Sequence, residues 1–342
     1  MKYTMKDVAK ACNTSTATVS MVLAGKDKRI SAGTRELIKK TAIAMDYYPN
    51  SMASSLAKKK SKYIGIVVND LRNSHIAELF MSINEVLQEK GFLLICHVLN
   101  GKIDDSTEIL AREIASENIS ALMWARPLEP NNDKDNGIIN SVIKSMDIPV
   151  FTMDQYEFEC PGVNVCFDYE NAGYLATKYL IDNGHKKIGC VTGNIGYKVT
   201  IDRLNGYKKA LCEAGIPYDD NVIFKGNYMM ESGSRGLPYL LGQGVTAVFA
   251  QNDEMAFGLY KAARTYGIRI PEDLSIVGCD NVEFDESLEV PLSTIEVPIV
   301  DMGHYLAEMI CKYVNDGNEN ERATKFYAPK LLVRGSVKKV SH

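Results

Sequence analysis

The apolar positions in the first fifty residues predict three short helices. Thr4 followed by Asp7 is typical of a capping box, and Asn13 suits the tight turn that ends the first helix. Ser15 is placed to cap a second helix, and a third begins near 31–34. The residues expected to face inward are Val8, Ala11, Val19, Val22, Leu23, Leu37, Ile38, Ala42 and Met45. Two helices joined by a tight turn and closed by a third form a helix-turn-helix.

From Tyr63 onward, short apolar runs alternate with segments of helical period. Runs suited to buried strands lie at 63–68, 92–97, 121–124, 163–165, 188–191, 222–224, 247–250 and 275–279. Helical segments lie at 76–90, 106–116, 169–183, 201–214, 232–241 and 254–266. This alternation is typical of parallel sheets covered by helices. Because it occurs on both sides of Pro161, we expect two similar α/β lobes.

Polar side chains follow the ends of several of these strands. They are Asn69, Asp70, Asn73, His75, Asp154, Gln251, Asn252, Asp253, Asp280 and Asn281. Parallel sheets bind ligands beyond the carboxyl ends of their strands, so two facing lobes would enclose a ligand among these residues. Together with Arg203, they can form a ring of hydrogen-bonding groups for hydroxyls. The alternative for each residue is that it caps the following helix, as Asn73 and Asp253 are placed to do.

Charge is divided unevenly along the chain, whose formal net charge is −4. Residues 1–60 hold 12 Lys and Arg and 4 Asp and Glu, whereas the remainder holds 27 and 39. A basic head on an acidic body indicates a polyanionic partner for the head, although a solvated basic face explains the charge equally well. The eight cysteines are scattered without a C-x-x-C pair, which favours reduced thiols over disulfides or zinc.

The segment after the third helix suits an insertion into DNA. Pro49 ends that helix, and Asn50 can cap a short helix of small residues up to Lys58. Leu56 is a large apolar residue of this segment and stands beside three consecutive lysines, as expected of a wedge in the minor groove. Two alternatives remain from the residues alone. Leu56 can pack against the body, and the three helices can form a cap with no role in DNA binding.

Several motifs in the head resemble one family. They are Asp7-Val8-Ala9-Lys10-Ala11, Ser15-Thr16-Ala17-Thr18-Val19-Ser20, Ser31-Ala32-Gly33-Thr34-Arg35, and Tyr48-Pro49-Asn50 with Ala53 and Leu56. Through residues 4–60 the chain resembles the DNA-binding head of the lactose-repressor (LacI/GalR) family. The resemblance implies a recognition helix at about 15–23 and a hinge helix at about 50–58 that folds on the operator as a dimer. The DNA contacts that we predict are Thr4, Ser15, Thr16, Ala17, Thr18, Ser20, Met21, Arg29, Thr34, Asn50, Ala53 and Leu56.

The head departs from the family pattern at three positions. Asn13 stands where the family usually has Gly, and Met21 and Ala24 stand where it often has Arg and Asn. Arg reads guanine through two hydrogen bonds, whereas Met can only touch apolar edges such as a thymine methyl. We therefore expect an operator half-site that differs from the common family site at the position that Met21 faces.

The body resembles the same family to about Val337. The motifs are Arg203-Leu204-Asn205-Gly206-Tyr207, Asn252-Asp253-Glu254-Met255-Ala256-Phe257-Gly258, Ile276-Val277-Gly278-Cys279-Asp280-Asn281, Pro291-Leu292-Ser293-Thr294-Ile295 and Leu332-Val333-Arg334-Gly335-Ser336. The resemblance implies that Arg203 and Asp280 are the main effector contacts. Further implied contacts are Asn252, Asp154 and Tyr228, with His75 and Ile76 where the family often has an aromatic pair.

The implied architecture is an all-α helix-turn-helix head joined to an α/β body of two doubly wound lobes, of the periplasmic-binding-protein-like type I fold. We expect a head at 1–48, a hinge or linker at 49–60 and an effector-binding, dimerising body at 61–342. The first lobe would take about 61–161 and 293–323, and the second about 162–292 and 324–340. Because no heptad helix follows Ser336, a homodimer is expected rather than a tetramer, and with it a pseudo-palindromic operator.

These features predict a cytoplasmic repressor that binds double-stranded operator DNA and is controlled by an effector, with a sugar favoured over a purine-like corepressor. The N-terminus lacks an apolar signal core, and no stretch is long enough to span a membrane, so a solute-binding protein for transport is disfavoured. The chain lacks the G-x-x-x-x-G-K-[ST], H-E-x-x-H and G-x-S-x-G motifs, and its five histidines are widely spaced. We therefore expect no enzyme activity, no catalytic residue, no metal and no cofactor.

Overall fold

The computed structural model describes residues 3–25, 29–48, 61–99, 113–114, 118–125, 137, 148–154, 163–316 and 323–340. Contacts within the chain divide it into two units, Met1–Ser61 and Lys62–His342. Each unit is described by itself below.

The first unit holds three helices, α1 (Met5–Ala11), α2 (Thr16–Leu23) and α3 (Ala32–Ala44). The carboxylate of Asp7 accepts hydrogen bonds from the Thr4 backbone N at 2.8 Å and from its Oγ1 at 2.7 Å, so the predicted capping box is present. Ser15 and Ser31 cap α2 and α3 through their Oγ atoms. Asn13 has a φ of 49°, which confirms the left-handed turn between α1 and α2.

The core of the head differs from the predicted one at two positions. Val8, Val19, Val22 and Ile38 are fully or almost fully buried, as expected. Leu37, however, is 50% exposed, and Ala11 is also exposed, with Cys12 buried in its place. The inward face of α3 follows the four-residue spacing from Ile38 to Ala42, which turns the neighbouring Leu37 toward solvent.

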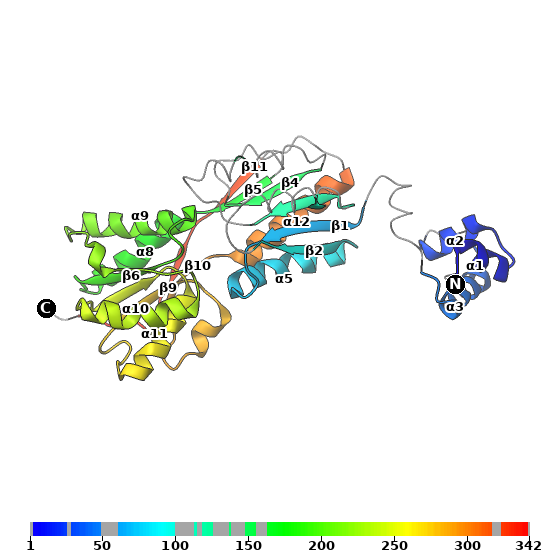
Figure 1. Ribbon diagram of the computed structural model, residues 1–342. Helices are drawn as coiled ribbons and strands as arrows, with labels where there is room; N and C mark the ends of the chain where they lie inside the picture. Colours follow the sequence, from blue (N-terminus) through cyan, green and yellow to red (C-terminus); the bar gives the residue numbers. More distant parts are fainter. Residues whose placement is uncertain are drawn as a thin grey trace. The chain divides into compact units, whose positions relative to one another are not determined.

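The first lobe of the body is built on a sheet with the strand order β11-β5-β4-β3-β1-β2 (Figure 1). Its strands are β1 (Tyr63–Val68), β2 (Leu93–Val98), β3 (Ala121–Trp124), β4 (Val150–Met153), β5 (Val163–Phe167) and β11 (Ala323–Tyr327). All pairings in it are parallel. Helices α5 (Ser74–Glu89) and α12 (Ile299–Asp316) pack against each other on this lobe. Most of the predicted helix at 106–116 lies outside the described residues.

The second lobe has a sheet with the order β12-β10-β9-β8-β6-β7. Its strands are β6 (Ile188–Thr192), β7 (Ile223–Lys225), β8 (Ala247–Ala250), β9 (Ser275–Asp280), β10 (Ser293–Glu296) and β12 (Lys330–Leu332). Helices α8 (Tyr169–Asp182) and α9 (Lys198–Glu213) cover one face, and α10 (Met230–Gly242) and α11 (Asp253–Tyr266) the other (Figure 1). Strands β6, β8 and β9 are wholly buried, which explains their continuous apolar runs.

The crossings between the lobes lie a few residues away from the predicted positions. Strand β5 pairs with β4 and β11, so the first lobe extends to Phe167, and the expected boundary at 161–162 is wrong. Strand β10 pairs with β9 in the second sheet, and β11 lies wholly in the first, so the expected boundaries at 292–293 and 323–324 are wrong as well. A buried apolar run looks the same in either sheet, because pairing partners are set by tertiary structure.

Within the described ranges, none of the helices has both the length and the apolar character needed to cross a membrane.

Candidate functional site

A cavity of about 560 Å³ opens between the two lobes of the body. It is bordered by the carboxyl ends of β1, β4 and β9 and by residues of α5, α8 and α9. All seven predicted effector residues line it: His75, Ile76, Asp154, Arg203, Tyr228, Asn252 and Asp280. The structure thus brings together residues that are up to about two hundred positions apart in sequence, as the carboxyl-end rule for parallel sheets predicts.

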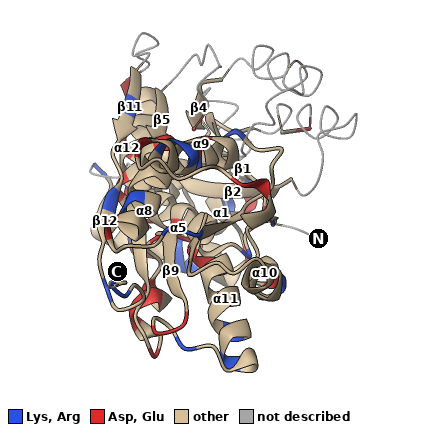
Figure 2. Ribbon diagram, turned by 90° about the vertical axis from the view of Figure 1, so that its left-hand side faces the viewer, with Lys and Arg blue, Asp and Glu red and all other residues tan. Residues whose placement is uncertain are grey.

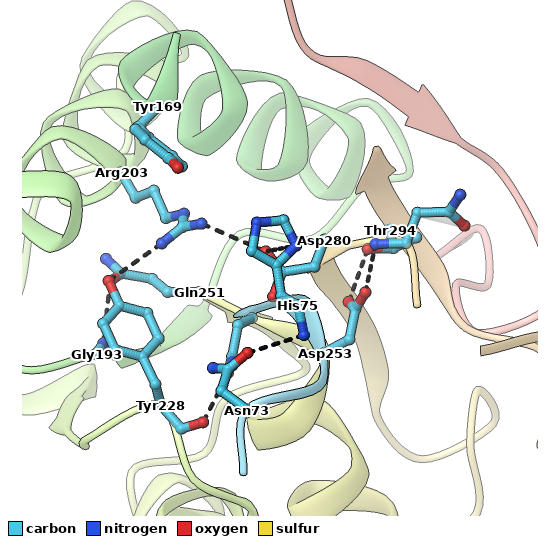
Figure 3. A network of polar contacts seen from close by, with 12 residues as sticks. Asn73, His75, Tyr169, Gly193, Arg203, Tyr228, Gln251, Asp253, Asp280 and Thr294 are labelled. Carbon is cyan, nitrogen blue, oxygen red and sulfur yellow. Dashed lines mark hydrogen bonds and ion pairs between the residues drawn. The ribbon is translucent and has the colours of Figure 1, made fainter. Parts of the chain in front are cut away.

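Arg203 on α9 is the centre of the cavity's polar network (Figure 3). It is only 4% exposed. Its Nη1 donates to the hydroxyl of Tyr228 at 3.1 Å, and its Nη2 lies 3.5 Å from Oδ1 of Asp280. The guanidinium also lies 4.4 Å from the ring centre of Tyr169, as in a cation–π contact. Within the part of the chain that the structure describes, its Nε has no hydrogen-bond partner. A buried cation held this loosely retains donor capacity that a ligand can satisfy.

Asp280 and His75 face each other across the cavity from different lobes. Asp280 ends β9, and its Oδ1 lies 3.9 Å from Nδ1 of His75, too far for a hydrogen bond. Burial raises the pKa of Asp280 to about 7, against the lowering effect of Arg203. Burial and the charge of Arg203 lower the pKa of His75 to about 4. Near neutral pH the imidazole is therefore uncharged, and neither of its ring nitrogens has a hydrogen-bond partner among the described residues.

Asp154 positions an aromatic ring rather than standing free in the cavity. It follows β4 with a φ of 55°. Its Oδ1 accepts from the backbone N of Phe167 at 2.9 Å, and its Oδ2 accepts from the hydroxyl of Tyr169 at 2.7 Å. Burial raises the pKa of Asp154 to about 6, although both hydrogen bonds lower it. Asp154 thus fixes the ring of Tyr169 beneath the guanidinium of Arg203.

Tyr228 is fixed in the same way by its neighbours. It has a φ of 68°, and its hydroxyl makes a 2.6 Å hydrogen bond with Oγ1 of Thr200. Asn252 donates from Nδ2 to the backbone O of Tyr228 at 3.1 Å and accepts from the backbone N of Met255. The ring lies against Gly193, where an added Cβ would come within 2.0 Å of it. Gly193 therefore serves the packing of Tyr228.

The helix-turn-helix head presents a polar face on α2. Thr16, Ala17, Ser20 and Met21 are exposed, as predicted. Ser15 and Thr18 are hydrogen-bonded to each other at 2.9 Å, and Thr34 is bonded in the same way to Ser31. Thr4 and Arg29 are exposed. The predicted hinge contacts Asn50, Ala53 and Leu56 lie outside the described residues.

Comparison with known proteins decides the family. Residues 4–50 match the domain described as bacterial regulatory proteins, lacI family, and residues 177–337 match the periplasmic binding protein-like domain. The HTH-type transcriptional repressor PurR of Vibrio atlanticus (strain LGP32) is 31% identical over 338 residues, which cover 98% of each chain. The chain belongs to the LacI family of bacterial regulatory proteins. The ribose operon repressor of Haemophilus influenzae (strain ATCC 51907 / DSM 11121 / KW20 / Rd) is another LacI-family relative, 33% identical over 98% of each chain.

Solved structures of LacI-family proteins have the same fold. The lac repressor dimer bound to operator and the anti-inducer ONPF has a TM-score of 0.84 at 23% identity, and the match covers 99% of this chain and 100% of that one. A LacI-family transcriptional regulator from Enterococcus faecium with bound ribose has a TM-score of 0.73 at 28% identity, over 82% of this chain and 100% of that one. The predicted family and fold class are thereby confirmed.

Some residues of this LacI-family site were missed or misassigned from sequence. Asp253 was a candidate cap for α11, but Asn252 is the cap. Asp253 instead accepts hydrogen bonds from the backbone N of Asn281 at 2.6 Å and from Oγ1 of Thr294 at 2.7 Å. The lining residues that were not predicted include Arg72, Tyr169, Asn194, Tyr197 and Asn227. Asn194 follows β6 and Tyr169 follows β5, so the carboxyl-end rule applied to every strand would have found both.

Metal binding was considered for the same LacI-family cavity. Among the residues that the structure describes, no group of three or more His, Cys, Asp and Glu side chains is arranged to hold a metal ion.

The raised pKa of Asp280 predicts a pH-dependent stability. Burial raises the pKa of Asp280 from the ordinary 3.8 of an aspartate to about 7, so between these values the folded state binds more protons than the unfolded chain. The contribution of Asp280 to the free energy of unfolding is therefore present at low pH and is lost as the pH rises through 7. Relative to Asp280→Asn, the free energy of unfolding of the wild type should fall by roughly 1.4 kcal/mol per pH unit between about pH 5 and pH 6.5.

Urea denaturation of both proteins at a series of pH values measures this difference. His75, whose lowered pKa gives the opposite slope, is present in both proteins, so its contribution cancels in the comparison to first order. Parallel stability curves for the two proteins across the range would contradict the prediction.

Proposed function

We propose that this chain is a repressor that binds operator DNA as a homodimer through its head, with an operator affinity set by a small effector bound between the lobes. One observation carries the proposal. The same chain joins a LacI-family head to a body whose cavity brings Arg203 and Asp280 together with unsatisfied hydrogen-bonding capacity. A cavity of about 560 Å³ is within the range of small-molecule sites.

The head is the unit suited to a polyanion. Residues 1–60 carry three times as many basic as acidic residues, whereas the body is acidic. Figure 2 shows residues of both signs scattered over the second lobe rather than gathered by sign. The exposed face of α2, with Thr16, Ala17, Ser20 and Met21, supports its role as the recognition helix. We assign phosphate contacts to Ser15, Thr18, Ser20, Arg29 and Thr34, a further DNA contact to Thr4, and the hinge contacts to Asn50, Ala53 and Leu56.

The charges that line the cavity favour an uncharged effector. Arg72 is paired with Asp70, its Nη2 lying 2.7 Å from Oδ2, and Arg203 is matched by Asp280. A phosphorylated ligand would bring negative charge into a lining that also holds the carboxyl groups of Asp154 and Asp280, at a large desolvation cost. Hydroxyl groups can instead use the unpaired Nε of Arg203, the nitrogens of His75 and the oxygens of Asp280. These groups support a sugar or sugar derivative.

A purine-like corepressor is the second candidate, and one observation weighs against it. A purine base is usually held by aromatic stacking, but the ring of Tyr169 already has the guanidinium of Arg203 at 4.4 Å, and the same group lies 5.6 Å from the ring of Tyr228. His75 and Ile76 line the cavity where the family often has an aromatic pair, so these two positions offer no large aromatic ring. The ribose-bound relative, which shares the fold, also favours a sugar.

Effector and operator binding are coupled through the angle between the lobes. An effector that binds one lobe angle better shifts the population toward it, and the angle sets the spacing of the two hinge segments in the dimer. Linkage requires the operator to change effector affinity by the same factor, typically about 5- to 150-fold. We infer that a sugar releases the operator, with corepression as the alternative outcome.

We also infer that the protein is not an enzyme and acts in the cytoplasm. Its curated relatives are transcription regulators, which supports the first inference. The division into a head at 1–48, a hinge at 49–60 and a body from 61 onward is part of the proposal.

Selection of duplexes from a random pool with the full-length chain tests the proposal. We expect recovery of a pseudo-palindromic site whose affinity falls steeply with salt, and release of that site by one sugar in a panel that also contains hypoxanthine. Ala17→Glu on the exposed face of α2 should abolish binding, whereas the control Ala44→Glu, at an exposed position of α3, should not. Absence of any enriched duplex would refute the proposal.

The recovered half-site tests the role of Met21. Met21 is 43% exposed on α2 and offers no hydrogen-bond donor. Met21→Arg should therefore shift the preferred base at one position toward guanine, by about 1–3 kcal/mol of discrimination. Comparison of the two selected sites measures the change. Identical sites for both proteins, or recovery of the common family half-site by the wild type, would defeat this assignment.

A further inference from the structure

A hydrogen bond joins the two lobes just outside the cavity. Oγ of Ser74 donates to Oε1 of Glu254 at 3.0 Å, between residues that are 180 positions apart. Ser74 is the first residue of α5 in the first lobe, and Glu254 is the second residue of α11 in the second lobe. Neither side chain lines the effector cavity, and both are half-buried.

The electrostatic setting of Glu254 strengthens this contact. Its carboxylate lies in the first turn of α11, which has 14 residues, and bonds to the first residue of α5, which has 16. The N-terminal end of a helix carries partial positive charge, so a carboxylate between two such ends is stabilised by both. A neutral side chain at this position would lose that attraction even if it kept the hydrogen bond.

The contact is also linked to the effector residues beside it. His75 follows Ser74 in the chain and faces Asp280 across the same gap, at 3.9 Å. The charge of Glu254 raises the pKa of Asp280, so the two carboxylates are close enough to influence each other. Movement of α5 away from α11 would break the Ser74–Glu254 bond and carry His75 away from Asp280 at the same time.

We propose that Ser74 and Glu254 form a latch that holds the two lobes at the angle of this structure, and so sets how much of the effector's binding energy is used to change that angle. The effect of the latch on effector binding rests on the proposed function, whereas the distance measurement that tests the latch does not. Glu254 and Ser74 are positioning residues, since they act on the effector site through α5 and not by touching the ligand.

Distance measurement within the full chain tests the latch without effector or DNA. Spin-labelled amino acids are introduced by genetic encoding at Gln88 on α5 and Lys261 on α11, both exposed. Doubly labelled chain is mixed with excess unlabelled chain, so that pulsed electron resonance reports only distances within one subunit. We expect Glu254→Gln and Ser74→Ala to lengthen and broaden the distance distribution. The control Glu231→Gln, an exposed carboxylate in the first turn of α10, should leave it unchanged.

The double variant separates a latch from two independent effects. If the two side chains act through one bond, Ser74→Ala should add little to the change caused by Glu254→Ala, which removes the acceptor. Thermal unfolding of each variant verifies that the chain remains folded. A distribution in Glu254→Gln that matches the wild type, or single-variant changes that simply add, would overturn the latch. Failure of duplex selection would count against the proposed function alone.

Discussion

Replacing Arg203 with alanine is expected to lower the free energy of unfolding by about 3–5 kcal/mol and to abolish the response to the effector. Arg203 is 4% exposed and is the cation nearest to the carboxylate of Asp280 in the cavity network. Its removal leaves Asp280 buried without its counter-charge, takes away one of the hydrogen bonds of the Tyr228 hydroxyl, and opens a void above the ring of Tyr169. Removing one partner of a buried pair costs much more than the pair contributes.

Urea denaturation measures the loss, and thermal shift with the sugar that stabilises the wild type measures the response. Arg235→Ala is a suitable control, because that side chain is 72% exposed and its only described ion pair, with Glu231, is long at 3.9 Å. The control should change stability by less than about 0.5 kcal/mol. If Arg203→Ala is too unstable to study, Arg203→Lys keeps a charge but not the fork of donors, and should still weaken the sugar response. An Arg203→Ala protein that stays as stable and as responsive as the wild type would contradict the assignment.

Replacing Gly206 with alanine should destabilise the second lobe by about 3 kcal/mol, although only one methyl group is added. A Cβ at Gly206 would lie 1.8 Å from the carbonyl O of Glu170 and 2.5 Å from the backbone N of Tyr174. Both are backbone atoms of α8, so no side chain can move aside. The reverse contact is equally tight, since a Cβ at Gly173 would lie 2.0 Å from the carbonyl O of Arg203. Any relief requires α9 to move away from α8 and to carry Arg203 with it.

The measurement is again urea denaturation, combined with the sugar-induced thermal shift. Gly242→Ala at the end of α10 is the matched control, because a Cβ there would meet nothing within 4 Å. That control should stabilise the protein by about 0.4–1 kcal/mol, since alanine restricts the unfolded chain. Equal stability of the Gly206 variant and the wild type would show that the two helices can separate at little cost.

Much of the structure of the head could be predicted from the sequence, because the interactions that define it are local. The hydrogen bonds of Thr4 with Asp7, the caps at Ser15 and Ser31, and the left-handed Asn13 each involve residues within three positions or a single backbone angle. The exposed face of α2 followed in the same way from helical spacing. Leu37 was placed wrongly because it adjoins the true inward position, Ile38, and apolar character alone does not distinguish neighbours on a helix.

The cavity residues were predicted for a different reason. Strand ends can be located from apolar runs, and parallel strands bring their carboxyl ends to one edge, so Asp154, Asn252 and Asp280 could be expected at one site. Arg203 was predicted as a site residue from its family motif, because its position within α9 does not show what that helix packs against. What these side chains do when they meet was not predicted. Asp154 holds Tyr169, and Asn252 caps α11 and holds Tyr228.

The sequence by itself therefore determined the helix-turn-helix, the alternation of strands and helices, and the residue types available at the strand ends. Each is set by interactions between near neighbours or by the periodicity of one element. Only the tertiary structure decided that β5 and β11 join the first sheet and that Ser74 meets Glu254. It also decided that the pKa of Asp280 is raised and that of His75 is lowered, so that both side chains favour their neutral forms. Such features depend on burial and on contacts between distant segments, which the order of residues along the chain does not specify.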